Sequence, residues 1–207
     1  MSDVNTLITG LLPDLHTDSI ANLVWWTKAE LIQWADEALK RAAKRFALFI
    51  NRDASQVTVS GSASFNRASR HLTTLHVAVG NRSLIASSSE ELFATDESYQ
   101  TTQGDPEERW YEDKLSTTTG YQPLTTAAAA GRTIRALYTE FPTELDTGEI
   151  NTTIPGPLCF GDYIQTAIRA EANSKESDAA MPEVAKHDRE MMSLYENLFS
   201  YYWGENQ

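Results

Sequence analysis

The chain has 207 residues, of which 41% are hydrophobic, and this is enough for one domain with a sizeable core or for one domain that carries an insertion. No apolar stretch approaches the roughly 20 residues that span a bilayer, and the N-terminus, MSDVNTLITGLLPDL, lacks the basic start of a signal peptide, so we expect a protein made and used in the cytosol. The net charge of −12 disfavours tight binding to phosphates, and the single cysteine, Cys159, excludes an internal disulfide and a multi-cysteine metal site.

The first strong helical pattern covers Lys28 to Ile50. Thr27 and Glu30 have the spacing of a capping box, in which each side chain satisfies a free backbone N–H of the other residue. Apolar residues then recur at three- and four-residue steps, which is the period of an amphipathic helix. The basic stretch KRAAKR, from Lys40 to Arg45, lies near the C-terminal end of this helix. We interpret it as a solvated or partner-facing stripe rather than as a grip on DNA.

Short β-prone segments follow from about Ser55. Gly80-Asn81 joins HLTTLHVAV to RSLIAS, and a Gly in the first position of a two-residue loop predicts a hairpin with a type II′ turn. Ser88 and Glu91 again have capping-box spacing, so SEELFATDESY is predicted to be a short helix. The segment DPEERWYED predicts a single helical turn. Further strands are predicted for TTTGYQPL, GRTIRALYTEF and GEINTTI.

The helical patterns return after Pro155 and Pro157. One helix is predicted over LCFGDYIQTAIRAEANS, and another over SDAAMPEVAKHDREMMSLYENLFSYYW. The last helix has Val184, Met191, Leu194, Tyr195, Leu198 and Phe199 on one side. We therefore expect a single α+β domain, with a helical bundle core from residues 1–54 and 156–207 and a β-rich insertion over residues 55–155.

The two histidines of the predicted hairpin are the first candidates for chemistry. His71 and His76 are five residues apart, so a regular strand points them to opposite faces, where they cannot share a metal ion. The register set by the turn makes the odd-numbered face, with Leu75, Val77 and Val79, the buried one. His76 then lies on the polar face, and we interpret it as structural.

Other catalytic signals are equally weak. The sequence contains no G-x-S-x-G elbow, no P-loop, no H-E-x-x-H and no G-x-G-x-x-G motif. Cys159 fits a small buried hydrophobe better than a nucleophile. Acidic pairs such as Glu107/Glu108 fit solvated caps better than an acid/base pair. We therefore expect no enzyme, no cofactor and no metal site.

The order of these segments resembles a known family. The helix WTKAELIQWADEALKRAAKRFALFI comes first, followed by HLTTLHVAVGNRSLIASSSEELFATDESY, then RTIRALYTEFP, PGPLCFGDYIQTAIRAEANSKES and the helix AKHDREMMSLYENLF. Over most of residues 23 to 200 this pattern is similar to the head-to-tail connector (adaptor, or neck) proteins of tailed bacteriophages. The most distinctive part is LTTLHV with its SSSEEL continuation.

The resemblance implies a structural virion protein. Such connectors form a ring of about twelve copies beneath the portal, extend the DNA channel, and offer a platform for the next tail or neck component. It implies a location in the virion neck after assembly in the host cytoplasm. The implied partners are the portal protein, neighbouring copies of the chain, the next tail or neck component, and double-stranded DNA that passes through the lumen without specific binding. No membrane is implied, and an acidic lumen would repel DNA and keep it moving.

Both helical ends, chiefly Lys28–Ile50 and Glu183–Trp203, are expected to form the wall between subunits and the contact with the portal. The β-rich insertion is expected to hang outward or toward the tail, and deletion of residues 199–207 to leave a folded monomer that no longer binds the portal. Basic, acidic and aromatic side chains make up the candidate interface: Lys40, Arg41, Lys44, Arg45, Glu183, Asp188, Glu190, Phe199, Tyr201, Tyr202 and Trp203.

Three alternatives remain open from the sequence. The chain could be a tail-completion or other minor virion protein of similar architecture. It could be a small hydrolase of the tail, acting on cell-wall polymer, whose site the sequence does not reveal. It could also be a host-type interaction domain.

Overall fold

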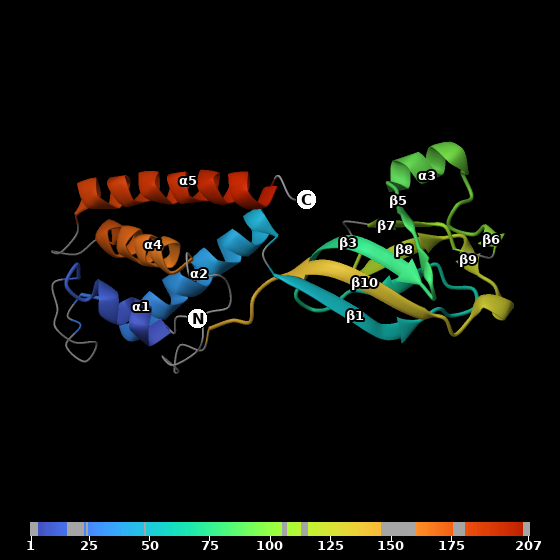
Figure 1. Ribbon diagram of the computed structural model, residues 1–207, viewed down its shortest axis with the longest axis horizontal. Helices are drawn as coiled ribbons and strands as arrows, with labels where there is room; N and C mark the ends of the chain where they lie inside the picture. The colour runs from blue at the N-terminus through green and yellow to red at the C-terminus, as the bar shows by residue number, and fades with distance from the viewer. Residues whose placement is uncertain are drawn as a thin grey trace. The chain divides into compact units, whose positions relative to one another are not determined.

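The chain folds into two compact units in the computed structural model. The helical unit comprises Met1–Phe49 and Phe141–Gln207, and the strand unit comprises Ile50–Glu140 (Figure 1). Within them, the structure describes residues 4–15, 23, 25–47, 49–104, 107–112, 116–145, 160–175 and 181–204. Among these residues no helix has the length and apolar character needed to cross a membrane.

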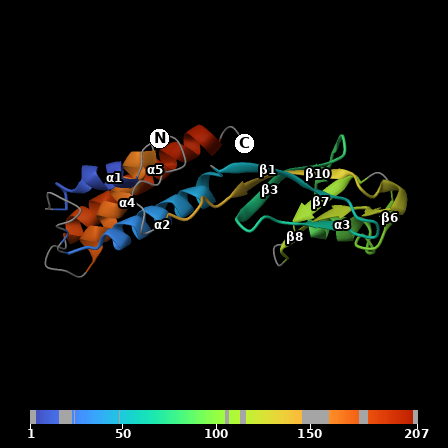
Figure 2. The same ribbon diagram turned by 90° about the horizontal axis from the view of Figure 1, so that it is seen from below.

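In its described residues, the helical unit contains four helices: α1 (Val4–Leu11), α2 (Lys28–Phe46), α4 (Phe160–Ser174) and α5 (Pro182–Gly204). Helix α4 is the central one, because it packs against each of the other three. Figures 1 and 2 show α5 lying along α4, with α1 and α2 on other sides of it. The buried cluster joins all four helices and includes Ile8, Leu31, Ile164 and Phe199.

Local signals set the start and the end of α2. The Thr27 hydroxyl accepts a hydrogen bond from the Glu30 backbone N–H at 3.2 Å, and the Glu30 carboxylate accepts one from the Thr27 N–H at 2.8 Å, which confirms the predicted capping box. Lys175 also binds the Glu30 carboxylate, and these contacts lower the pKa of Glu30 to about 2. The helix ends at Phe46, where Ala47 adopts a left-handed φ of 49°, and not at Ile50 as predicted.

The described part of the strand unit contains two four-stranded sheets. The first has the order β1 (Ile50–Val57), β10 (Thr133–Glu140), β3 (His71–Val79), β4 (Arg82–Ser83). The second has the order β2 (Ser64–Asn66), β8 (Thr118–Gln122), β7 (Arg109–Glu112), β5 (Ile85–Ala86). A small pair, β6 (Gln103–Gly104) with β9 (Leu124–Thr125), a helix α3 (Ser89–Thr95) and a 3₁₀ turn (Ala127–Ala129) complete the unit.

The predicted fold class is wrong in its account of the core. The described residues form an α+β protein with five helices and two sheets of four strands each, and the strands dominate the core, in place of a helical bundle that carries a β insertion. Side chains such as Val77, Trp110, Tyr121 and Ile134 build a buried cluster belonging to the sheets alone. The error has a physical cause: β10 pairs antiparallel with both β1 and β3, and such long-range pairing leaves no local pattern in the sequence.

The segment DPEERWYED also differs from its predicted helical turn. Its residues Arg109–Glu112 form strand β7, in which Trp110 and Tyr111 are buried. Tyr111 lies opposite Gly120 of β8, and a Cβ built on Gly120 would stand 2.2 Å from the ring carbon Cζ of Tyr111. Because only glycine leaves that space, the Tyr111 ring can cover the β8 backbone.

The predicted hairpin exists but is shorter than expected. Val79 pairs with Arg82 across the turn, and Gly80 has the positive φ (57°) of a type II′ turn, as predicted. Beyond Leu84 the second strand leaves β3, and β5 pairs parallel with β7 in the other sheet. Val77 and Val79 are buried as expected, whereas Leu75 is exposed, because a β-bulge shifts the register of β3 against β10 next to His76.

The two histidines of β3 have different surroundings. The His71 side chain is almost fully covered, its Nε2 lies 2.9 Å from the Thr74 hydroxyl, and its ring packs on Tyr138. Burial lowers the pKa of His71, although Glu112 opposes this effect. His76 is exposed. Within the described residues no group of three His, Cys, Asp or Glu side chains could hold a metal ion, and Cys159 lies outside those residues.

Val77→Asp is expected to abolish folding of the strand unit, whereas the neighbouring His76→Gln should leave it intact. Val77 is 0% exposed, and burying an unpaired carboxylate costs several kcal/mol out of a typical domain stability of about 5–15 kcal/mol. Thermal unfolding followed by near-ultraviolet circular dichroism measures both variants. A cooperative transition in the Val77→Asp protein within about 5 °C of the wild type would contradict this assignment of faces.

Candidate partner interface

The four candidate cations lie on the C-terminal half of α2, and two of them form ion pairs with carboxylates of the same chain. The Lys40 ammonium lies 2.8 Å from both the Asp36 and the Glu144 carboxylates, and these contacts raise the pKa of Lys40 to about 12. Arg45 forms an ion pair with Glu196 of α5. These two cations therefore contribute to the stability of the helical unit.

Arg41 and Lys44 lie on the exposed surface of α2. The Lys44 ammonium stands 5.6 Å from the centre of the Phe141 ring, which is a cation–π distance. Neither residue has a carboxylate partner among the ion pairs of the described chain that involve α2. Glu37, one turn before Arg41, is also exposed and accepts a hydrogen bond of 3.0 Å from Gln33. The basic part of this surface is therefore confined to the last turns of the helix.

Glu196 is the buried centre of a small polar network in this unit. It is 8% exposed, and its Oε1 accepts a hydrogen bond of 3.1 Å from the Tyr163 hydroxyl, while Arg45 pairs with Oε2. Burial and the negative charge of Glu196 together raise the pKa of Tyr163. Because every member has a partner, this network orients α5 against α2 and α4.

Asp188 was expected at a subunit interface, and the structure corrects that expectation. The side chain is 0% exposed and accepts two hydrogen bonds from the Arg169 guanidinium, at 2.6 and 2.8 Å. Arg169 also donates to Asp14 at 3.0 Å, and these carboxylates raise its pKa. This bidentate ion pair joins α5 to α4, so Asp188 is not available to a neighbouring copy.

Phe199 is likewise a core residue. It is 3% exposed and stacks on Phe160 at 4.5 Å between ring centres, and its edge contacts include Phe46 at 5.5 Å. The expectation that deletion of residues 199–207 leaves a folded monomer is therefore not supported by this packing. Tyr201 is exposed, and the side chains of Tyr202 and Trp203 lie outside the described part of the chain.

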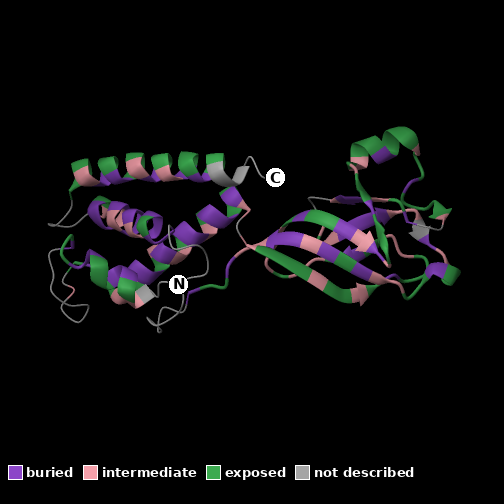
Figure 3. Ribbon diagram, viewed as in Figure 1, coloured by how far each residue is buried: buried purple, intermediate pink, exposed green. Residues whose placement is uncertain are grey.

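Helix α5 has two different faces (Figure 3). The face that packs on α4 buries Ala185, Asp188, Met192 and Phe199. The sequence pattern had placed Leu194 and Leu198 on the same side as Phe199, but they are 59% and 50% exposed, and Tyr201 is 63% exposed. We call Leu194, Leu198 and Tyr201 the outer stripe. They repeat at steps of four and three residues, as the buried set does, but on the opposite side of the helix.

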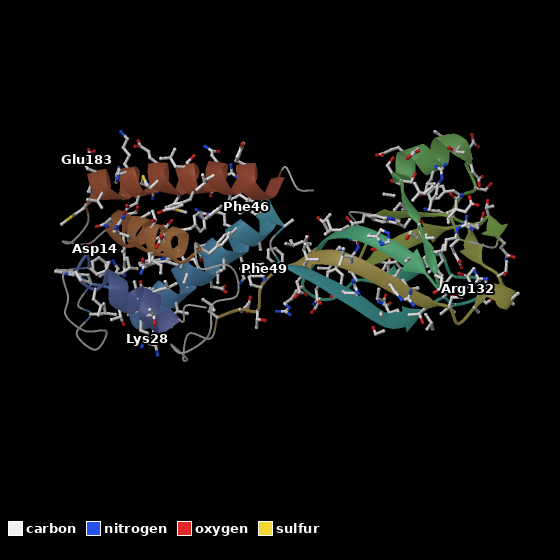
Figure 4. The ribbon with its side chains drawn as sticks, viewed as in Figure 1. Asp14, Lys28, Phe46, Phe49, Arg132 and Glu183 are labelled. Carbon is white, nitrogen blue, oxygen red and sulfur yellow. The ribbon has the colours of Figure 1, made fainter. Side chains whose placement is uncertain are left out.

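Two carboxylates continue the outer stripe toward the start of α5. Glu183 and Glu190 are exposed, and their spacing of seven residues places them on one side of the helix. Glu190 lies about one turn before Leu194, on the same side as the stripe. Neither carboxylate has an ion-pair partner within the described part of the chain. We call these two residues the acidic pair, and Figure 4 shows Glu183 at the start of α5.

Among the described residues of the strand unit, the structure shows two sizeable hollows that are open to solvent. One, of about 390 Å³, includes Ser64, Tyr99 and Thr118 in its lining, and the other, of about 430 Å³, includes Glu108 and Arg109. Both hollows are open to solvent, and polar and apolar side chains line each of them.

Glu107 differs from its predicted role as a solvated cap. It is 1% exposed, and its carboxylate accepts a hydrogen bond from the Thr125 hydroxyl at 2.9 Å and pairs with the Arg132 guanidinium at 3.3 Å. The Glu107 carboxylate is therefore a buried, paired group whose partners belong to the strand unit itself.

The chain matches no protein-family model, and a search of curated proteins finds no match.

Proposed function

We propose that this chain is a structural subunit of a ring that joins the head of a tailed bacteriophage to its tail. The observation that carries the proposal is the outer stripe of α5, where Leu194, Leu198 and Tyr201 are each at least half exposed. An apolar strip that continues into charged residues is typical of a surface that another protein covers. The resemblance in segment order to head-to-tail connectors supplies the kind of assembly.

The charge of the chain supports a role around a DNA channel. A net charge of −12 makes a ring of such subunits strongly acidic, and an acidic wall repels the phosphate backbone of DNA. The proposed ring sits beneath the portal in the virion neck, contains about twelve copies, extends the channel for DNA, and carries the next tail or neck component.

The same charge predicts how the ring assembles. Like-charged subunits repel one another, so the isolated chain is expected to be monomeric or weakly associated, and to form a ring on the portal, which offsets that repulsion. Light scattering and negative-stain microscopy of the purified chain, with and without the portal protein of the same phage, measure this. A stable ring without the portal at low salt would contradict the assembly order, and the absence of any complex with the portal would contradict the proposed function.

A further inference from the structure

We propose that the outer stripe and the acidic pair of α5 in one copy dock onto the exposed face of α2 in the next copy, around Arg41 and Lys44. This contact goes beyond the proposed function by naming the two surfaces that join the copies, and it rests on that function only for the closure of the ring. Its occupant is a second copy of this chain.

The exposed face of helix α2 carries positive charges that can pair with the negative charges of the α5 surface. Arg41 and Lys44 are exposed cations without a carboxylate partner, whereas Glu183 and Glu190 are exposed carboxylates without a cation partner, within the described chain. The long aliphatic stems of Arg and Lys can cover apolar side chains while their charged ends reach carboxylates. The α2 face can therefore cover Leu194 and neutralise the acidic pair beside it.

A symmetric contact between two α5 helices covers the stripe but leaves the charges unmatched. In an antiparallel pair that buries both stripes, Leu198 lies at the two-fold axis, and Glu190 lies about 12 Å from it along each helix. At that distance Glu190 lies beyond Tyr201 of the partner, and the sequence from residue 199 onward contains no Lys or Arg. Shifting the axis toward Glu190 would instead press that carboxylate against the partner's Leu198. The charge pattern therefore favours α2 as the partner surface.

The position of the two faces in the helical unit gives the contact its direction. Helix α4 packs against both α2 and α5, and each of these helices turns its buried face inward and its exposed face outward (Figure 3). The exposed faces of α2 and α5 are thus different surfaces of one copy. A contact between two different surfaces is head-to-tail, and repetition of it builds a ring or a filament rather than a closed dimer.

Cysteine cross-linking distinguishes the two geometries. In a Cys159→Ser background, the double variant Arg41→Cys/Glu190→Cys should give a ladder of dimers, trimers and higher species with a flexible bismaleimide at high protein concentration. Glu190→Cys alone should give no covalent dimer. A dimer from Glu190→Cys alone at a rate equal to that of the double variant, or only monomer from the double variant, would overturn the proposal.

Charge reversal gives an independent readout. Arg41→Glu/Lys44→Glu and Glu183→Lys/Glu190→Lys should each weaken self-association by at least about tenfold, because each variant presents an α2 and an α5 surface of like charge. An equal mixture of the two should restore association, because every α2–α5 contact between unlike variants again joins opposite charges. Arg52→Glu/Arg82→Glu, which changes two exposed arginines of the strand unit, is the matched control. It alters the net charge as much as Arg41→Glu/Lys44→Glu does and should leave association unchanged.

Sedimentation velocity at high protein concentration, where the weak association of the isolated chain can be measured, compares all of these samples. The variant that carries all four charge-reversing substitutions in one chain should also associate, since its α2 and α5 surfaces are again opposite in sign. Weak association of the mixture and of that combined variant would contradict a head-to-tail contact between α2 and α5.

The outcomes separate this inference from the proposed function. A ladder with the predicted charge dependence, together with no binding to the portal, would leave the contact standing and overturn the connector. A ring on the portal that survives both charge reversals would leave the connector standing and overturn the contact.

Discussion

Replacing Asp188 with alanine should destabilise the helical unit by about 3 kcal/mol, because Arg169 then loses both of its short contacts to a buried carboxylate. Asp14, at 3.0 Å and about half exposed, remains as a partner for the guanidinium and keeps the loss toward the lower end of the range for broken buried pairs. Urea denaturation followed by far-ultraviolet circular dichroism gives the difference in the free energy of unfolding.

Glu190→Ala is the matched control for Asp188→Ala. Both residues are acidic and lie on α5, but Glu190 is exposed and Asp188 is fully buried, so the control should change the free energy of unfolding by no more than about 0.5 kcal/mol. Equal effects of the two substitutions would show that the Arg169–Asp188 pair does not stabilise the packing of α5 on α4.

The second large effect is expected at Phe199. Phe199→Ala removes a buried ring that contacts Phe46, Phe160, Tyr163 and Tyr195, so it should cost about 3–5 kcal/mol through lost burial and the cavity that remains. Tyr201→Ala, two residues later on the exposed face, should cost less than about 1 kcal/mol. Chemical denaturation of both variants measures the difference.

Phe199→Ala and Tyr201→Ala together distinguish a residue of the folded core from a residue of the contact surface. If the outer stripe binds another protein, Tyr201→Ala should weaken association with the portal or with other copies while its folding stays normal. A Phe199→Ala protein as stable as the wild type would contradict the aromatic packing at the end of α5. Normal association of the Tyr201→Ala protein would remove Tyr201 from the proposed contact surface.

The sequence predicts the parts of the fold that local chemistry controls. Thr27 and Ser88 each cap a helix as their spacing to Glu30 and Glu91 predicts, since these hydrogen bonds join residues only three positions apart. The Gly80 turn is predicted for the same reason, because its positive φ suits glycine. Such signals lie within a few residues of one another and need no knowledge of the tertiary structure.

Features that depend on distant partners were not predictable in this way. Strand β10 pairs with both β1 and β3, and its partners are remote in the sequence, so the two-sheet core had no local pattern. Asp188 resembled any exposed acid of α5 until Arg169 of α4 was placed beside it. Phe199 looked like a terminal aromatic anchor, because only the packed structure shows Phe46 and Phe160 around it.

The face of α5 shows why a candidate interface is harder to predict than a helix. The sequence pattern put Leu194 and Leu198 with Phe199 on one apolar side, and this assignment hid the exposed stripe. A helix that carries two apolar stripes has one for its own core and one for another surface. The spacing allowed either set to be the core, and only the packing against α4 decides between them.

An electron cryo-microscopy reconstruction of the neck of the virion would show whether this chain forms a ring between the head and the tail. We expect a ring of density between portal and tail into which the helical and strand units of this chain fit, with α5 of one copy against α2 of the next. A neck in which no density fits this chain, or a reconstruction that places it elsewhere in the particle, would contradict the account.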